Sequence, residues 1–184
     1  MFSQAKTAQM AASFLSKANG QLNIVKLMKL LYLAEREALE KFGFSISDDR
    51  FVSMNLGPVL SDTYNLINGE ERDSAVWDEW ISDRAQHSVA LNREINSRDD
   101  LDELSNAELS VIETIWQRFG HMTQWELVDY THQHLPEWRN PNGSSTPIEV
   151  KDILQGVGYA SEQSEQIAES IQSARTVKRV LSRL

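Results

Sequence analysis

The feature that most constrains the fold is an apolar segment near the N-terminus, IVKLMKLLYLAEREALEK, at residues 24–41. Its hydrophobic residues recur three and four positions apart, which predicts a helix. They form one apolar line with a second beside it: Ile24, Leu27, Leu31, Ala34 and Ala38, then Leu30 and Leu33. Asn23 is a suitable N-cap residue, and Gly43 follows where the helix should end. A helix that is apolar on so much of its circumference is expected at the centre of the core.

Other segments predict further helices and a few extended stretches around this one. The helices are expected, from apolar spacing or helix-start residues, at residues 4–18, 60–67, 105–119, 123–132, from Thr146, Pro147 and Glu149 onward, and from Ser161 or Ser164 to the end. Ser105 with Glu108 and Thr123 with Glu126 have the spacing of capping boxes. Residues 50–54 look extended, and β-branched and aromatic residues in 75–95 predict a β-hairpin.

These patterns predict a mainly α protein, a compact single-domain helical fold with one small β-hairpin. The domain is expected over residues 1–160, and residues 161–184 are expected to form an amphipathic helix that packs on it or extends it. The apolar stripe of that last helix is Ile167, Ile171, Ala174, Val177, Leu181 and Leu184.

Charge is distributed unevenly along the chain. The formal net charge is −9, yet residues 1–30 and 175–184 contain Lys or Arg and no acid, so all 27 acidic residues lie in 31–174. An acidic body of this kind is repelled by phosphate backbones and complements a basic protein partner. Solubility alone also accounts for such a charge.

The residue types that carry catalysis or bind cofactors are missing or lack the required spacing. The chain has no Cys, which excludes disulfides, thiolate zinc sites and Cys nucleophiles. His132, His134 and Glu137 come nearest to a metal set, but the two His lie two positions apart and point to different helix faces. There is no glycine-rich phosphate loop and no nucleophile elbow. We therefore expect no enzyme activity, no cofactor and no metal.

The sequence also bears on the compartment of the protein. Its first residues lack the continuous apolar centre of a signal peptide, and no stretch has the length and hydrophobicity of a membrane span. The absence of Cys is typical of a reducing compartment. We expect a cytoplasmic protein with no membrane partner.

DNA binding is an alternative function that the sequence leaves open. Helices followed by a hairpin are compatible with a winged helix, and Lys26 and Lys29 lie three apart on one helix face, where they are able to meet phosphates. The candidate wing, however, carries Asp78, Glu79 and Asp83, and affinity for DNA depends on positive charge. We expect the isolated protein not to bind DNA tightly.

Two blocks of motif residues resemble a known family. The first is KLMKLLY at residues 26–32, followed by Gly57-Pro58-Val59 and then Tyr64; the second is a capped helix with Thr131-His132, followed by Pro136 and Trp138. Their order and spacing, over about residues 8–154, resemble the Panacea antitoxin domain family, which includes SocA-type antitoxins and phage-associated GepA-like proteins. The sequence departs from the family pattern at Glu137, which separates Pro136 from Trp138, and the helix after Ser161 has no counterpart in that pattern.

The resemblance implies an antitoxin of a type II toxin–antitoxin pair, which neutralises a cognate protein toxin, encoded by an adjacent gene, by direct binding. It does not identify the toxin, because the family pairs with unrelated toxins. The motif or partner-binding positions are Lys26, Lys29, Tyr32, Gly57, Pro58, Val59, Tyr64, His132 and Trp138. Tyr32, Tyr64 and Trp138 are large enough to act as hot spots, and the C-terminal helix face with Arg175 and Lys178 is a further candidate.

Other interpretations of the same residues stay open. Gly57-Pro58 is able to serve as a tight turn after which proline starts the next helix, so that the motif sets the angle between two core helices. The alternative functions are a winged-helix-like DNA-binding transcriptional regulator and an adaptor that presents a partner to a protease. The sequence does not decide whether the protein forms a homo-oligomer.

Overall fold

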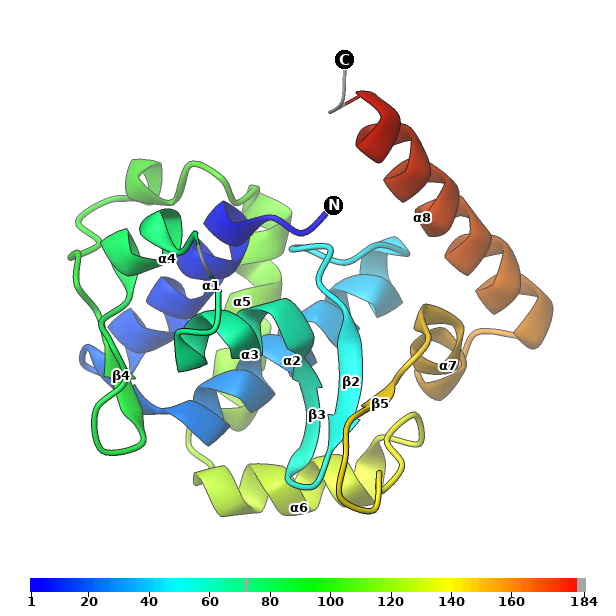
Figure 1. Ribbon diagram of the computed structural model, residues 1–184, viewed down its shortest axis with the longest axis horizontal. Coiled ribbons are helices and arrows are strands. Elements are labelled where there is room, and N and C mark those ends of the chain that lie inside the picture. The colour runs from blue at the N-terminus through cyan, green and yellow to red at the C-terminus, as the bar shows by residue number, and fades with distance from the viewer. Residues whose placement is uncertain (72, 182–184) are drawn as a thin grey trace.

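The computed structural model describes residues 1–71 and 73–181 of the chain (Figure 1). The elements found in these residues are, in chain order, α1 (Gln4–Lys17), β1 (Gln21–Asn23), α2 (Ile24–Phe42), β2 (Phe51–Met54), β3 (Gly57–Leu60), α3 (Ser61–Asn68), α4 (Ala75–Trp80), β4 (Ser88–Ala90), the 3-10 helix η1 (Arg98–Leu101), α5 (Asn106–Phe119), α6 (Gln124–His134), β5 (Thr146–Pro147), α7 (Val150–Gly156) and α8 (Ser161–Leu181). The prediction of a mainly helical fold is confirmed. None of the described helices is long and apolar enough to cross a membrane.

Helix α2 lies at the centre of the core, as the sequence predicts. The Asn23 side chain accepts hydrogen bonds from the backbone N–H groups of Val25 and Lys26, and Gly43 ends the helix in the left-handed conformation, with a φ of 72°. The helix contacts α1, α5, α6, α7 and strand β3, and the side chains from Leu27 to Ala34 are all buried (Figure 1). Its broad apolar surface is therefore covered by neighbours on every side.

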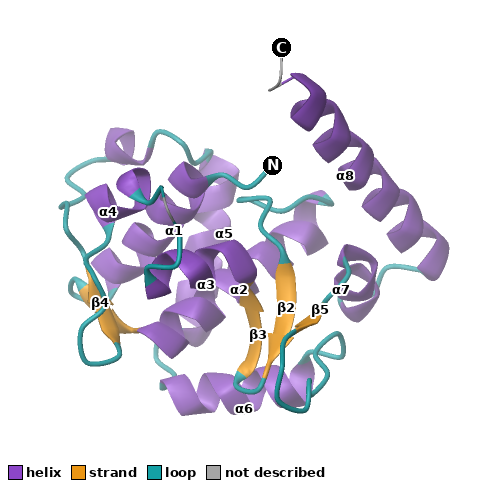
Figure 2. Ribbon diagram, in the orientation of Figure 1, coloured by secondary structure: helices purple, strands orange, loops and turns teal. Residues whose placement is uncertain are grey.

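The strands of the described residues form two small antiparallel sheets (Figure 2). One pairs β1 with β4, and the other has the order β3-β2-β5. Strands β2 and β3 make a hairpin in which Phe51 pairs with Leu60 and Met54 with Gly57. Strand β5 returns the chain to β2 from the other side, so the second sheet joins residues near 52 to residues near 147.

The β-hairpin expected at residues 75–95 is wrong in its first arm. Residues 75–80 form helix α4, in which Trp77 and Trp80 are both buried. Side chains three apart share a face of a helix but point to opposite faces of a strand, so a helix buries both tryptophans against one neighbour. The second arm is extended, but β4 pairs with β1. The two arms are linked by the isolated bridges Ile81–Leu91 and Ala85–Ser88 and by hydrogen bonds such as that from the Ser82 N–H to the carbonyl of Ala90.

Two proline positions also differ from the prediction. Gly57 and Pro58 lie in strand β3, not in a turn that starts a helix; the turn is formed by Asn55-Leu56, and α3 begins at Ser61. Proline is tolerated there because β3 is an edge strand, where a missing N–H costs no central ladder bond. Similarly, Thr146-Pro147 forms β5, and α7 begins only at Val150.

The predicted caps of the two helices beside α2 are confirmed. Ser105 with Glu108 at the start of α5, and Thr123 with Glu126 at the start of α6, both form reciprocal capping boxes. Each box satisfies backbone N–H groups that a helix start would otherwise leave unpaired. Both helices contact α2, so the caps fix the ends of core elements.

Helix α8 begins at Ser161, the first of the two predicted starts, and runs along the outside of the molecule (Figure 1). It contacts α7 at its start, and Ile167 and Ile171 pack against the core. Further along, Val177 and Leu181 are exposed. Leu184, the last residue of the expected stripe, lies outside the described residues. The apolar stripe is therefore covered at its start and open at its distal end.

Candidate functional site

The first group of motif residues comes together where α2, β3 and α6 meet. The Lys29 Nζ donates a hydrogen bond to the carbonyl oxygen of Pro58 at 2.7 Å. Gly57 has a φ of +99°, and a Cβ added there would lie 2.6 Å from Thr131 Oγ1 and 3.0 Å from Lys29 Nζ. Glycine is therefore required twice at this position, for its backbone conformation and for the close approach of its neighbours.

Lys29 is an unusual member of this group because its side chain is only 1% exposed. Burial lowers its pKa to about 7. The pKa of His132 is lowered as well, first by burial and then by the charge of Lys29. The junction thus favours the neutral forms of both side chains, which is the expected response of cations held in a low-dielectric interior.

A second group connects α2 with the loop after α6. The Glu137 carboxylate accepts hydrogen bonds from Arg36 Nε at 2.7 Å and from Tyr32 Oη at 3.2 Å. Arg36 also donates to the carbonyl of Gly156 at 3.1 Å. The Tyr32 side chain is fully buried, and burial, followed by the charge of Glu137, raises its pKa. Glu137, the departure from the family pattern, is therefore the buried partner of α2.

The His132 and Trp138 rings also pack at this junction. They stack with centroids 3.9 Å apart and planes 14° from parallel, and Trp138 Nε1 donates to the carbonyl of Met54 at 3.0 Å. His132 Nε2 is buried and has no hydrogen-bond partner among the described residues. No group of three or more His, Asp or Glu in residues 1–71 and 73–181 is arranged to hold a metal ion. His132 thus belongs to the packing of the junction.

The lysines considered for phosphate contacts are used inside the fold. The Lys26 Nζ donates to the carbonyl of Gly120 at 2.7 Å and lies 5.7 Å from the centroid of the Trp116 ring. Lys29 is buried, as described above. Since the first arm of the expected wing is helix α4, the residues that suggested a winged helix do not form one.

The remaining motif residues border a pocket of about 290 Å³ between α2 and the β2–β3 turn. Lys29, Gly57, Val59 and Tyr64 line it, together with Met28, Met54, Leu56 and residues 143–145. Tyr64 and Trp138 are half-buried, whereas Val59, Gly57 and Pro58 are buried. Of the three aromatic hot-spot candidates, Tyr32 thus presents no surface to a partner in this structure, and Tyr64 and Trp138 present part of theirs.

Sequence reasoning missed Glu35 and Arg36 as structural residues. Burial raises the pKa of Glu35 to about 7, and its carboxylate accepts hydrogen bonds from the backbone N–H groups of Ile46 and Ser47. Both charged residues belong to a helix with apolar residues on most of its circumference. That pattern was the sequence signal that could have predicted their burial. Such a helix leaves few positions facing water, so its charged side chains need partners within the protein.

A family model supports the assignment that these motifs suggest. The model for the SocA-like antitoxin, Panacea domain, matches residues 27–139, which is more than half of the chain. The matched range is narrower than the resemblance over about 8–154 and excludes α1, α7 and α8. No curated protein and no solved structure matches the chain. The chain therefore belongs to the family of SocA-like antitoxins with a Panacea domain.

Proposed function

We propose that the protein is the antitoxin of a type II pair and neutralises a cognate protein toxin by direct binding. The observation that carries this proposal is the match of the antitoxin family model to residues 27–139, which include both motif blocks except Lys26. The toxin is expected to be encoded beside this gene. The acidic stretch of the chain, residues 31–174, favours encounter with a toxin that is basic overall.

The structure supports a division of labour within such an antitoxin. Lys29, Tyr32 and Gly57 are buried and hold α2, β3 and α6 together. A scaffold fixed from within leaves its exposed residues available for partner recognition. We therefore assign partner selection to exposed side chains, with Tyr64 and Trp138 as the motif residues that retain accessible surface.

The alternative functions receive no comparable support. A DNA-binding regulator would need accessible cations, and the two lysines that suggested it are held within the fold. No observation favours an adaptor that presents a partner to a protease. Direct neutralisation is the function that the family and the geometry support together.

The test is co-expression of this chain with the product of the neighbouring reading frame. We expect that product alone to arrest growth, co-expression to restore growth, and the two chains to co-purify as a stable complex. The Leu31→Asp variant is the control, because a charge in the core should prevent folding. It should therefore neither restore growth nor co-purify with the product. If the wild-type chain neither restores growth nor co-purifies with the product, the proposed function is wrong for this pair.

A further inference from the structure

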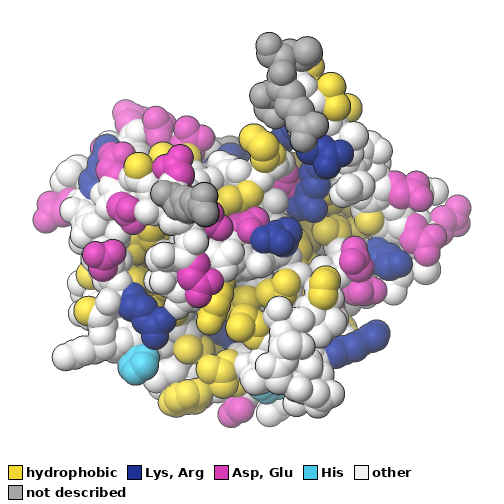
Figure 3. Space-filling view, in the orientation of Figure 1, with side chains coloured by type: hydrophobic (Ala, Val, Ile, Leu, Met, Phe, Trp, Pro, Cys, Tyr) yellow, Lys and Arg dark blue, Asp and Glu magenta, His cyan; other side chains and the backbone are white. Residues whose placement is uncertain are grey.

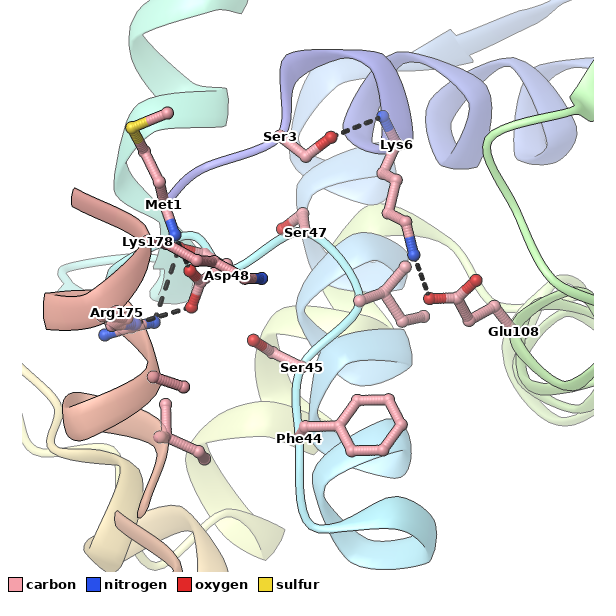
Figure 4. Close-up of a pocket in the computed structure, with 13 residues that line it drawn as sticks. Met1, Ser3, Lys6, Phe44, Ser45, Ser47, Asp48, Glu108, Arg175 and Lys178 are labelled. Carbon is pink, nitrogen blue, oxygen red and sulfur yellow. Dashed lines mark hydrogen bonds and ion pairs between the residues drawn. The ribbon is translucent and has the colours of Figure 1, made fainter. Parts of the chain in front are cut away.

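A groove separates α8 from the body of the protein (Figure 4). It consists of two adjoining cavities, of about 460 and 630 Å³, which share Phe44, Ile171 and Ala174. One wall is the segment that follows α2, residues 43–48, and the other wall is α8. Because the cavities share these residues, they lie next to each other along the helix.

The floor of this groove is rigidly held. The buried carboxylate of Glu35 accepts hydrogen bonds from the backbone N–H of Ile46 at 2.5 Å, the backbone N–H of Ser47 at 2.8 Å and the Ser47 hydroxyl. Three hydrogen bonds to one buried carboxylate fix the segment between α2 and β2. The floor is therefore preformed, which lowers the entropy lost when a partner binds.

The wall formed by α8 is held near both of its ends. Before the helix, the Tyr159 hydroxyl donates to the carbonyl of Glu40 at 2.9 Å. Toward its distal end, Arg175 Nε donates to Asp48 Oδ1 at 2.6 Å, and Figure 4 shows this pair closing one end of the groove. Between the two attachments Ile167 and Ile171 pack against the body of the protein, and the two cavities lie open beside them.

The lining of the groove combines exposed apolar surface with positive charge. Phe44 is 54% exposed and Met1 63%, and Figure 3 shows hydrophobic and basic side chains together in the hollow beside α8. Two of its charges are neutralised internally, since Lys6 pairs with Glu108 and Arg175 with Asp48. Lys178, which also lines the groove, makes no ion pair or hydrogen bond with any described residue.

The distal half of α8 extends this character beyond the groove. Val177 and Leu181 are 59% and 62% exposed, and residues 175–184 contain basic residues and no acid. This end contrasts with the acidic residues 31–174. A groove that exposes apolar side chains such as Phe44, with the cation of Lys178 at one end, fits an amphipathic helix that carries an acidic residue beside its apolar stripe.

We propose that this groove and the distal half of α8 are the docking surface for an acidic amphipathic helix of the toxin. The inference rests on the proposed function. Apolar side chains of that helix pack over Phe44 and Ile171, and one of its carboxylates pairs with Lys178. The assignment is local: a toxin that is basic overall, and is drawn to the acidic body, still meets this corner of the antitoxin with an acidic segment.

Two pairs of full-length variants test the docking surface, with the product of the neighbouring reading frame as the binding probe. Lys178→Glu reverses the unpaired charge, and its control is Lys151→Glu, an exposed lysine of α7 outside the groove. Phe44→Ser removes apolar surface, and its control is Trp125→Ser, an aromatic residue of α6 that is 58% exposed. We expect each groove variant to weaken binding about tenfold or more and each control to bind like the wild type. Circular dichroism checks that all four remain folded.

The outcomes separate this inference from the proposed function. If the wild type and all four variants bind the probe equally, the groove inference is wrong and the antitoxin proposal stands. If the wild type does not bind, the antitoxin proposal fails, and the groove inference fails with it. If Phe44→Ser converts a wild-type dimer to a monomer without weakening the probe, the groove is an interface between copies of this chain. A charge reversal on the probe then identifies the docked helix. It is the helix in which changing one acidic residue to Lys restores binding to the Lys178→Glu variant.

Discussion

The junction around Gly57 and the groove beside α8 use polar residues in opposite ways. At the junction, Lys29 and Glu137 are buried and bonded to neighbouring elements. In the groove, Lys178 has no partner among the described residues and Phe44 is more than half exposed. The family match covers the junction, whereas α8 lies beyond its last residue. Motif residues therefore define the scaffold, and the surface that selects a partner is expected where the match ends.

The largest difference between the two regions should appear when one leucine is truncated in each. Leu31 is fully buried in α2, so Leu31→Ala should lower the free energy of unfolding by about 2–5 kcal/mol. Leu181 is 62% exposed, so Leu181→Ala should change it by less than about 0.5 kcal/mol. Urea denaturation of both variants measures these differences. Equal losses would mean that α8 is part of the cooperative core.

Two glycines with positive φ separate backbone strain from steric contact. Gly143→Ala places a side chain in open space at a φ of +112° and should cost about 1–2 kcal/mol from backbone strain alone. Gly57→Ala adds the collision with Thr131 and Lys29, so it should lower the free energy of unfolding by about 1–3 kcal/mol more than Gly143→Ala does. Thermal unfolding of both variants is the measurement. Similar costs would show that the junction yields easily and is less tightly packed than described.

The stability of the protein should depend on pH through two buried groups of α2, Lys29 at the junction and Glu35 beneath the groove. The pKa of Glu35 is raised from 4.5 to about 7 on folding, so between these values the folded state holds a proton that the unfolded chain lacks. Stability therefore falls as the pH rises through this range. The pKa of Lys29 is lowered from 10.5 to about 7, so above pH 7 the unfolded chain holds the extra proton and stability rises. Each slope is at most about 1.4 kcal/mol per pH unit.

Single variants assign these slopes to their residues. Glu35→Gln should flatten the decline below pH 7, and Lys29→Met should flatten the rise above it. Denaturant titrations from pH 4.5 to 10.5 supply the curves. A wild-type curve that is flat over the whole range would show that neither group changes its proton affinity on folding.

The smallest effect is expected for the ion pair that attaches α8 to the body. Arg175 is partly exposed, so Arg175→Ala should cost no more than about 1 kcal/mol in overall stability. It should nevertheless speed hydrogen exchange in α8, because few other contacts hold the distal helix. Lys178→Ala, which removes no described contact, is the control and should leave exchange unchanged. Unchanged exchange in Arg175→Ala as well would show that other contacts fix the helix.

The sequence predicts the elements whose signals are local. The caps at Asn23, Ser105 and Thr123, and the apolar period of α2, depend on residues a few positions apart and are confirmed. The strand pairing of β4 with β1 depends on residues far apart, which no local pattern encodes. Trp77 and Trp80 favoured a strand by their residue type, but joint burial against α1 overrode that preference.

The candidate site was predictable only in part, for a related reason. Motif spacing identified Lys29, Gly57 and His132, and the structure places all three at one junction. Motif spacing gave no indication that Lys29 would be buried or that Glu137 would bond to Arg36, since both depend on how distant segments pack. The groove was also invisible, because it exists only when α8 lies across the segment after α2.

The bond between Glu137 and Arg36 also has a consequence for the timing of synthesis. Arg36 leaves the ribosome about a hundred residues before its partner, so the nascent chain has no carboxylate to place against that face of α2. An unpaired charge in such a position strongly opposes closure of the domain. The scaffold therefore completes only after the second motif block has emerged. If the proposed antitoxin function holds, a growing chain is expected to give no protection until Glu137 has emerged.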